Sequence, residues 1–218
     1  MLPEVEKEKQ RAAEAAAELV EDGMTVGLGT GSTVAHLLPA LAARRLSLRC
    51  VATSPRTEQA ATELGLRVER FTLERLDIAI DGADQISPDG WLVKGGGGAH
   101  TREKLVAVTA DRFVVIGDST KPVATLHAPI PLELVSFGLE STLARIGTVR
   151  LRDVAPSPDG GVIADFTGDV GEPGALAARL EAIAGVVEHG LFPPDIVATV
   201  FVARGGSVQR IDIGRTPG

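Results

Sequence analysis

The sequence predicts an α/β fold: a Rossmann-like domain with a mostly parallel sheet, followed by a second, smaller ferredoxin-like α+β domain. Short apolar runs alternate with helical stretches over residues 1–128, which is the pattern of a mostly parallel sheet. Residues 129–197 change to the order strand, helix, strand, strand, helix, strand. A chain of 218 residues with 44% hydrophobic content can build a substantial core.

The Rossmann-like domain is predicted to span residues 1–128 and 198–218. Its first helix, residues 3–21, is rich in Ala, Glu and Lys, has Pro3 in its first turn and stops at Asp22-Gly23. Residues 198–213 are expected to return to this domain as extra strands. The other elements predicted here are strands at 24–28, 48–52, 77–80 and 113–116 and helices at 34–43, 57–64 and 101–110.

The ferredoxin-like domain is predicted to span residues 129–197. Two prolines, Pro129 and Pro131, mark the change of pattern. Its elements are expected at 132–135 (strand), 138–146 (helix), 148–152 (strand), 161–167 (strand), 174–184 (helix) and 186–191 (strand).

Composition excludes several classes of function. With 22 Lys and Arg against 29 Asp and Glu, the net charge is −7, which argues against nucleic acid as the partner. Cys50 is the one cysteine, so there is no intramolecular disulfide, and a small buried apolar side chain is expected. The charged N-terminus lacks a secretory signal, and no apolar run reaches membrane-spanning length. These features predict a cytoplasmic protein with no membrane partner.

A glycine loop, Gly29–Thr33, joins a predicted strand to a predicted helix. The run GLGTGS does not match the dinucleotide fingerprint, and no Lys follows Gly31 as in a Walker loop. Backbone N–H groups, the hydroxyls of Thr30, Ser32 and Thr33, and a helix N-terminus would together suit one phosphate monoester. The alternative is a plain helix cap by Ser32 or Thr33.

The segment from Asp81 to Lys104 holds two carboxylates, a lysine, four consecutive glycines and a Glu-Lys pair. Glycines contribute no side chain to a core, so this run indicates close approach of a ligand to main-chain N–H groups. Asp81, Asp84, Lys94 and Glu103 supply charge around it. This is the composition of a proton-transfer site.

Three loops are expected at one edge of the parallel sheet. Ligands gather beyond the carboxyl ends of parallel strands, and Asp81 and the Gly29–Thr33 loop each follow such an end. The turn that ends in Lys121 leaves the strand at 113–116 at the same edge. Lys121 is therefore expected to join the pocket.

Each of these residues has a structural alternative. Asp81 and Asp84 could form an acid/base pair, a metal pair or an Asx-type turn with no chemistry. Metal is the weakest of the three, because Lys94, Lys104 and Lys121 would compete with a divalent ion.

Glu103 near a helix start could simply interact with the helix dipole. The histidines form no evident triad with a serine in a nucleophile elbow. His36, His127 and His189 are expected to be structural, whereas the position of His100 inside the glycine segment leaves its role open.

The motifs together resemble one family, the ribose-5-phosphate isomerases of the A type. The resemblance rests on GTGST at 29–33, DGAD at 81–84, KGGGGA at 94–99, TREK at 101–104, and Lys121 after an Asp-Ser-Thr turn. Each motif alone is weak evidence, but their order and spacing are highly specific. The similarity covers nearly the whole chain up to about Phe192.

The resemblance implies interconversion of ribose 5-phosphate and ribulose 5-phosphate through a cis-enediol intermediate, with no metal and no organic cofactor. It implies that Glu103 is the base that moves a proton between C2 and C1. Asp81, Asp84 and Lys94 would transfer protons at O1 and O2, help to open the furanose ring and stabilise the oxyanion. The implied substrate-binding residues are Thr30, Gly31, Ser32, Thr33, Gly82, Ala83, Gly95, Gly96, Gly97, Lys121 and Lys9.

The resemblance further implies a homodimer or homotetramer that acts in the non-oxidative pentose phosphate pathway. The sequence departs from the family pattern at Gln85, where Glu is usual, at Gly98, where Ala is common, and at His100, which replaces an apolar residue. A larger departure begins at Phe192-Pro193-Pro194-Asp195, where the usual Arg-Ala-Asp run is missing. None of these removes an expected catalytic group.

Two other readings compete with the isomerase. One is a sugar-phosphate sensor domain like those of some bacterial repressors, which normally carry a DNA-binding helix-turn-helix ahead of this fold. The other is a related α/β enzyme, such as an acyl-CoA transferase-like hydrolase or an isomerase for another sugar phosphate. Glu103 together with Lys94 and two Asp fits enolisation better than a transferase nucleophile.

Overall fold

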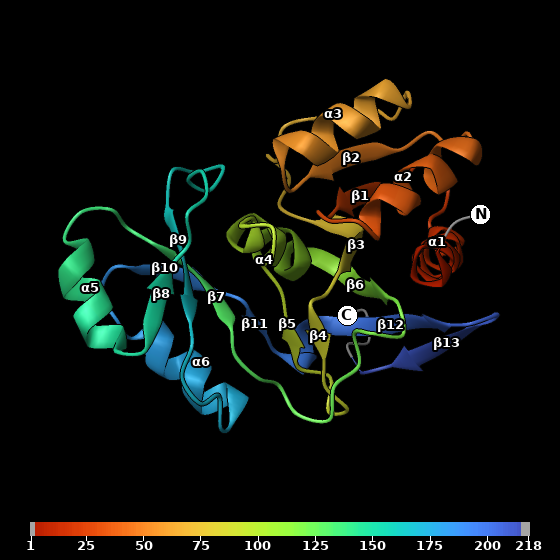
Figure 1. Cartoon of the computed structure of the whole chain (residues 1–218). Coiled ribbons are helices and arrows are strands. Elements are labelled where there is room, and N and C mark those ends of the chain that lie inside the picture. Colours follow the sequence, from red (N-terminus) through yellow and green to blue (C-terminus); the bar gives the residue numbers. More distant parts are fainter. Residues whose placement is uncertain (1–2, 215–218) are drawn as a thin grey trace. The chain divides into compact units, whose positions relative to one another are not determined.

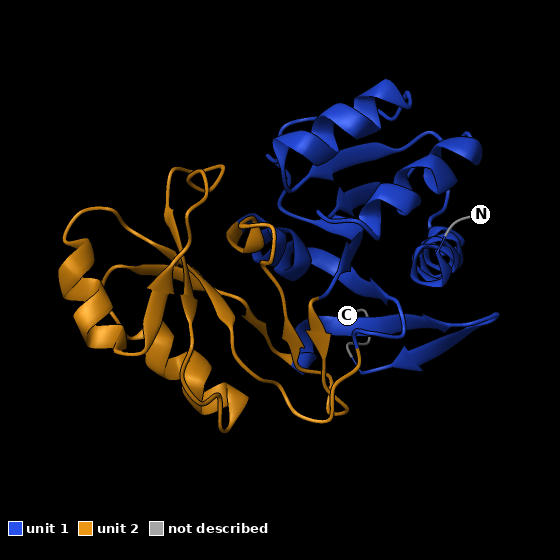
Figure 2. Ribbon diagram, viewed as in Figure 1, with its two compact units in different colours: residues 1–83, 102–121, 194–218 blue, residues 84–101, 122–193 orange. Residues whose placement is uncertain are grey.

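The computed structural model describes residues 3–214 of the chain. Their backbone forms two compact units, which are coloured separately in Figure 2. The first unit contains the residues up to Ala83, the segment Arg102–Lys121 and the residues from Pro194 onward. The second contains Asp84–Thr101 and Pro122–Pro193.

A six-stranded sheet in the order β13-β12-β6-β3-β1-β2 forms the centre of the first unit. Every neighbouring pair is parallel except β12 and β13, which form an antiparallel hairpin. Figure 1 shows this sheet running from β2, beside α3, to β13. The mostly parallel sheet and the return of the C-terminal segment are confirmed. The strands are β1 (Thr25–Leu28), β2 (Arg49–Ala52), β3 (Leu76–Gly82), β6 (Ala110–Gly117), β12 (Val197–Arg204) and β13 (Ser207–Asp212).

The helices of the first unit begin within two residues of their predicted starts. The side chain of Ser54 accepts a hydrogen bond from the Thr57 N–H, and a proline occupies the first position of that helix. The first helix ends at Ala17, earlier than predicted, and carbonyls at its end accept hydrogen bonds from the Arg44 guanidinium. The helices are α1 (Glu4–Ala17), α2 (Val34–Ala43), α3 (Pro55–Glu63) and most of α4 (His100–Thr109).

One face of α1 packs into the core of the first unit. Ala12, Ala13, Ala16 and Ala17 are buried there with aliphatic side chains of β1 and β3. The spacing of these alanines places them on one helical face, and their small side chains allow close packing. Glu8 lies one turn before Ala12 and is also buried. A carboxylate in that position needs hydrogen-bond donors.

The second unit contains a four-stranded antiparallel sheet in the order β10-β7-β9-β8. Its chain order is strand, helix, strand, strand, helix, strand, so the predicted ferredoxin-like pattern is confirmed. The helices pack apolar side chains such as Ile146, Leu176 and Leu180 into its core. The elements are β7 (Ile130–Leu134), α5 (Leu139–Ile146), β8 (Val149–Leu151), β9 (Val162–Phe166), α6 (Pro173–Glu181) and β10 (Val186–His189).

A small three-stranded sheet in the second unit is absent from the sequence prediction. It has the order β11-β5-β4 and consists of two-residue strands, β4 (Gln85–Ile86), β5 (Leu92–Val93) and β11 (Leu191–Phe192). Strands this short carry no periodic signal, and β11 pairs with a segment far away in the sequence. Two of its strands, β4 and β5, lie just before the glycine segment in the chain.

The compact units have different bounds from the predicted domains. Residues 84–101 belong to the second unit, although the sequence pattern assigns them to the Rossmann-like domain. The domain assignment itself stays a prediction. In residues 3–214, no helix is both long and apolar enough to cross a membrane.

Candidate functional site

The glycine loop and Asp81 meet at the carboxyl ends of β1 and β3, as predicted. The Gly29 N–H donates to the Ile80 carbonyl at 3.0 Å, and the Thr30 N–H donates to Asp81 Oδ1 at 3.0 Å. The same carboxylate oxygen accepts the Gly82 N–H at 2.7 Å. Asp81 is 3% exposed. Its carboxylate is therefore fixed by the backbone of both loops.

A glycine is required at position 29 because the Asp81 side chain fills the space beside it. A Cβ atom there would lie 1.9 Å from Asp81 Cγ and 2.0 Å from Oδ1. The absence of a side chain at Gly29 thus leaves room for the Asp81 carboxylate. The Thr30 N–H of this loop is donated to Asp81, and phosphate binding by the loop stays a prediction.

The predicted cap of the helix that follows is not formed by Thr33. Thr33 is the N-cap residue of α2, but its backbone is already helical and its side chain makes no capping bond. A side-chain cap needs an extended residue at this position, whose oxygen can turn back to the next N–H groups. At Gly31 the φ angle is +130°, a conformation that favours glycine.

Two threonines that cluster with Thr30 at the same edge, Thr53 and Thr57, are not among the predicted site residues. Thr30 Oγ1 lies 2.7 Å from Thr53 Oγ1, and the Thr57 hydroxyl donates to the Gly29 carbonyl at 2.9 Å. Thr53 directly follows β2, so the rule that selected Asp81 could have found it as well. These hydroxyls fix the orientation of the Thr30 side chain.

The turn after β6 presents Lys121 at the sheet edge expected for it. Asp118 accepts the Thr120 N–H at 2.9 Å and also the Thr120 hydroxyl, while the Lys121 N–H donates to the Asp118 carbonyl at 3.2 Å. Strand β6 lies beside β3, with Ile116 opposite Gly82. The Lys121 side chain is half-buried, and no ion pair to it occurs among residues 3–214.

Glu8 fastens this turn to α1, a contact that the sequence did not reveal. Its Oε2 accepts the Ser119 N–H at 3.0 Å and the Ser119 hydroxyl at 2.6 Å, and its Oε1 accepts the Gly205 N–H at 2.6 Å. These hydrogen bonds, chiefly that from the Ser119 hydroxyl, hold the pKa of Glu8 below its usual value of 4.5. The carboxylate therefore ties three segments of the first unit together.

We expect Glu8→Gln to lower the melting temperature, because an amide supplies one acceptor atom where the carboxylate supplies two. The folded-state pKa lies below the unfolded one, so this stabilisation is present above about pH 4.5 and is lost as pH falls through the folded-state pKa. The difference in melting temperature between wild type and variant should therefore be large at pH 7 and shrink below pH 4.5. Glu18→Gln, an exposed change at the end of α1, is the control. A difference that is constant with pH would contradict this.

Lys9 is held by a neighbour on the same helix. Its ammonium lies 2.6 Å from Glu6 Oε1, and Glu6 Oε2 lies 3.0 Å from His36 Nε2. The Lys9 side chain is 14% exposed. Its predicted contact with substrate stays a prediction.

In the second unit, the glycine segment is held by Asp84. The Asp84 N–H donates to the Val93 carbonyl at 2.8 Å, and Asp84 Oδ2 accepts the Gly96 N–H at 2.8 Å. Gly95 has φ +104°, and a Cβ there would lie 2.7 Å from the His100 ring. A Cβ at Gly96 would lie 2.9 Å from Asp84 Oδ1. The bare backbone at Gly96 thus accommodates the Asp84 carboxylate. Substrate binding by this segment stays a prediction.

Lys94 is a buried cation at the end of β5. It is 2% exposed, its N–H donates to the Gly190 carbonyl at 2.8 Å, and its ammonium lies 5.5 Å from the centre of the Phe192 ring. The ring face is negative, so it stabilises a desolvated ammonium. Such a cation interacts strongly with any developing negative charge.

Glu103 lies in the first turn of α4 and is 4% exposed. Helix α4 crosses the boundary between the units, since Thr101 belongs to the second and Arg102 to the first. The position in the first turn agrees with both the catalytic and the helix-dipole interpretation. The catalytic role of Glu103 stays a prediction.

The other singled-out side chains have structural partners. Gln85 and the backbone of His127 exchange two hydrogen bonds, at 2.7 and 2.9 Å, so Gln85 fixes a loop. His189 Nδ1 accepts the Leu191 N–H at 3.2 Å.

Burial, with a smaller effect of the Glu69 charge, raises the pKa of the Cys50 thiol to about 12. Within residues 3–214 no group of three or more His, Cys, Asp or Glu side chains could hold a metal ion.

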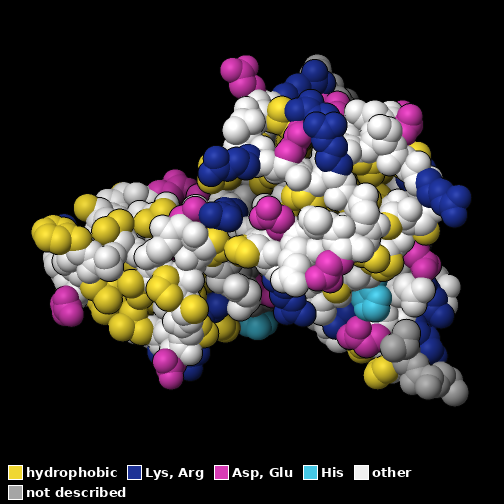
Figure 3. Space-filling model, turned by 90° about the horizontal axis from the view of Figure 1, so that it is seen from above, with side chains coloured by type: hydrophobic (Ala, Val, Ile, Leu, Met, Phe, Trp, Pro, Cys, Tyr) yellow, Lys and Arg dark blue, Asp and Glu magenta, His cyan; other side chains and the backbone are white. Residues whose placement is uncertain are grey.

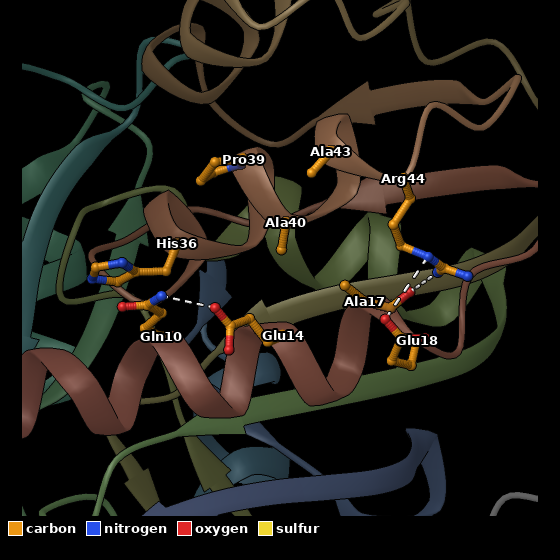
Figure 4. A pocket seen from close by; sticks show the side chains of 9 residues that line it. All are labelled: Gln10, Glu14, Ala17, Glu18, His36, Pro39, Ala40, Ala43 and Arg44. Atoms are coloured by element: carbon orange, nitrogen blue, oxygen red, sulfur yellow. Dashed lines mark hydrogen bonds and ion pairs between the residues drawn. The ribbon is translucent and has the colours of Figure 1, made fainter.

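A separate groove of about 550 Å³ lies in the first unit along α1 and α2. Figure 4 shows Gln10, Glu14 and His36 toward one end and Arg44 toward the other, with alanines between them. None of the residues predicted for the site lines it.

A mostly parallel sheet with a glycine loop and the buried Asp81 at its carboxyl edge places the chain among the α/β enzymes. The family profile described as ribose 5-phosphate isomerase A (phosphoriboisomerase A) matches residues 49–206. The ribose-5-phosphate isomerase A of Halobacterium salinarum is 46% identical over 199 residues, which cover 85% of this chain and 88% of that protein. The chain belongs to the ribose 5-phosphate isomerase A family.

Solved structures of that family share the fold. The ribose 5-phosphate isomerase A from Neisseria gonorrhoeae is 30% identical with a TM-score of 0.90, covering 96% of this chain and 98% of that one. A D-ribose-5-phosphate isomerase in complex with phospho-erythronic acid is 29% identical with a TM-score of 0.89, covering 95% and 99%. The predicted fold class is thereby confirmed.

A second profile, the DeoR C-terminal sensor domain, matches residues 4–71. This match spans α1 to α3 and ends before Asp81, so it includes neither the glycine segment nor Glu103. The sensor alternative is not favoured.

Proposed function

We propose that the chain interconverts D-ribose 5-phosphate and D-ribulose 5-phosphate through a cis-enediol intermediate that needs no metal ion. The observation that carries this proposal is the 46% identity, along 85% of the chain, to a protein named ribose-5-phosphate isomerase A. The complex of a similar protein with phospho-erythronic acid adds support. Phospho-erythronic acid has a carboxylate at one end and a phosphate at the other. The two carboxylate oxygens resemble the two oxygens of an enediolate of the sugar phosphate.

Glu103 is the proposed base that moves a proton between C2 and C1. Removing a proton next to a carbonyl needs a positioned base, which typically contributes about 10² to 10⁴ in rate. The burial of Glu103 and its place in the family's TREK run support this role. Burial also excludes bulk water from around this carboxylate, so its electrostatic interactions with the substrate are strong.

Lys94, Asp81 and Asp84 are the proposed partners of the substrate oxygens. Negative charge develops on O1 or O2 as the enediolate forms, and a buried ammonium stabilises it far more strongly than one in water. The burial of Lys94 supports this part. The two aspartates would move protons at these oxygens and help to open the furanose ring.

The remaining predicted residues are proposed to bind the phosphate and the sugar hydroxyls. Hydroxyl groups, backbone N–H groups and ammonium groups are the usual phosphate ligands. The binding energy of the phosphate would hold the reacting carbons against the base. These residues are Thr30, Gly31, Ser32, Thr33, Gly82, Ala83, Gly95, Gly96, Gly97, Lys121 and Lys9.

We expect Lys121→Ala to raise KM for ribose 5-phosphate by about 10- to 100-fold, with kcat changed much less. The reason is that a hydrogen bond from an ammonium to phosphate would be lost in the ground state and the transition state alike. Steady-state kinetics check this, with Lys7→Ala as the control, because Lys7 pairs with Glu4 on α1. An unchanged KM would exclude a phosphate role for Lys121.

The setting of the enzyme is also proposed from the family: a cytoplasmic homodimer or homotetramer in the non-oxidative pentose phosphate pathway. Exposed apolar side chains in the second unit support self-association, among them Phe137 (91% exposed), Val135 and Val187. Figure 3 shows hydrophobic side chains gathered on one face of that unit.

Proton NMR of ribose 5-phosphate in D₂O with the EDTA-treated protein tests the proposed function. The expected result is ribulose 5-phosphate, with deuterium entering the C1/C2 unit, because an enediol exchanges its proton with solvent through the base. Binding without exchange would favour the sensor reading. Absence of binding would direct the search to another sugar phosphate.

A further inference from the structure

Arg152, which follows β8 in the second unit, makes an unusually complete set of hydrogen bonds. Its Nε and Nη2 donate to the two carboxylate oxygens of Asp165, at 3.0 and 2.6 Å. Asp165 on β9 is 3% exposed, and the Arg152 side chain is 17% exposed. A bidentate pair of this kind fixes the plane of the guanidinium.

The remaining guanidinium nitrogen is directed at the glycine segment. Arg152 Nη1 donates to the Gly95 carbonyl and to the Gly96 carbonyl, both at 3.0 Å. A glycine backbone has more accessible conformations than any other, so these carbonyls need an external partner to fix their direction.

The peptide between Gly95 and Gly96 is thus held on both sides. Its C=O accepts from Arg152, and its N–H donates to Asp84 Oδ2 at 2.8 Å. The C=O and N–H of a trans peptide point in opposite directions. Arg152 and Asp84 therefore bind opposite edges of the same peptide plane, and together they fix its orientation. Among residues 3–214, the Gly96 N–H is the one donor to the Asp84 carboxylate.

We propose that Arg152 is a positioning residue that sets the direction of the Asp84 carboxylate through the Gly95–Gly96 peptide. Asp84 is exposed and its carboxylate has no other fixed donor in the described chain, so the direction of this N–H decides where it points. Asp165 in turn fixes Arg152. The catalytic consequence rests on the proposed role of Asp84 in proton transfer.

The kinetic test is Arg152→Lys, which keeps the charge beside Asp165 but cannot hold two carbonyls and a carboxylate in one plane. We expect kcat to fall by about 10- to 100-fold and KM to change by less than about threefold, as for a misplaced catalytic group. Arg179→Lys is the matched control. Arg179 lies in the same unit, over the Phe166 ring at 5.2 Å, and donates to the Ile146 carbonyl at 3.5 Å.

A double-mutant cycle tests whether Arg152 acts through Asp84. If it does, Arg152→Lys in an Asp84→Asn background should slow turnover by less than about twofold. Independent, multiplicative effects would overturn the proposal. An equal drop in kcat in Arg179→Lys would also overturn the proposal. It would show that the loss comes from loosening of the whole unit and not from the contact of Arg152 with the glycine segment.

An NMR measurement separates this inference from the proposed function. The Gly96 amide proton should shift upfield in Arg152→Lys and stay in place in Arg179→Lys, whatever the enzyme activity. An unchanged Gly96 signal in Arg152→Lys would overturn the proposal. Trp91, the one tryptophan of the chain, lies in the second unit, so its fluorescence during urea unfolding confirms that the variants are folded. Asp165→Asn removes the charged partner that orients the Arg152 guanidinium. This variant should therefore shift the Gly96 amide proton in the same direction.

Discussion

Replacing Glu103 by Gln is expected to lower kcat by about 10²- to 10⁴-fold while KM changes by less than about threefold. Glutamine has the same shape as glutamate and keeps a hydrogen-bonding head, so binding and packing should persist. It cannot accept a proton at neutral pH, so the step between C2 and C1 would lose its base. The same variant should lose deuterium exchange into the substrate in D₂O.

The control for Glu103→Gln must reproduce the loss of a charge near a helix N-terminus. Glu58→Gln does so, because Glu58 lies in the first turn of α3 in the same unit. A carboxylate in such a position contributes about 0.3–1 kcal/mol to stability through the helix dipole. If Glu103 served only the dipole, both variants would lose a little stability and keep wild-type kcat. That result would remove Glu103 from the mechanism.

Gly29→Ala is expected to abolish most activity and to destabilise the protein by about 1–3 kcal/mol. The new Cβ would lie 1.9 Å from Asp81 Cγ, a separation that no pair of non-bonded atoms tolerates. Asp81 would have to leave its two backbone donors, at Thr30 and Gly82, or β1 and β3 would have to separate. Either response misplaces a proposed catalytic carboxylate, so we expect kcat/KM to fall by at least about 100-fold.

Urea unfolding and steady-state kinetics of Gly29→Ala check this, beside Gly23→Ala. Gly23 precedes β1 and has φ +84°, and a Cβ added there would meet no atom within 4 Å, so its replacement strains the backbone without touching Asp81. We expect that control to lose stability and to keep its kcat/KM. Equal losses of activity in the two variants would mean that stability alone, and not the placement of Asp81, explains the result.

The elements of the fold could be predicted because their signals are local. Apolar runs, helix caps and glycine turns in the first 128 residues indicated the parallel sheet, and β1, α2 and α4 lie within one residue of their predicted bounds. The carboxyl ends of parallel strands share one edge, so the meeting of Gly29 and Asp81 followed from strand order. The small sheet of β4, β5 and β11 could not be predicted in this way, because its strands are too short to show a period.

The partners of the site residues could not be predicted from the same signals. Four glycines indicated a bare backbone, but not that the Gly96 N–H would be donated to Asp84 or that Arg152 would hold the carbonyls on the other side. Glu8 is 111 residues from Ser119 and 197 from Gly205 in sequence. Hydrogen bonds over such separations depend on how elements pack, and no spacing rule records them.

The sequence by itself determined the family, the α/β class and the residue types for proton transfer, because these depend on motifs and on periods of two and 3.6 residues. The tertiary structure alone decided which groups hold the buried carboxylates: Thr30 and Gly82 for Asp81, and Ser119 and Gly205 for Glu8. A buried carboxylate must find donors, and the donors within reach are set by the packing of segments that are distant in the chain.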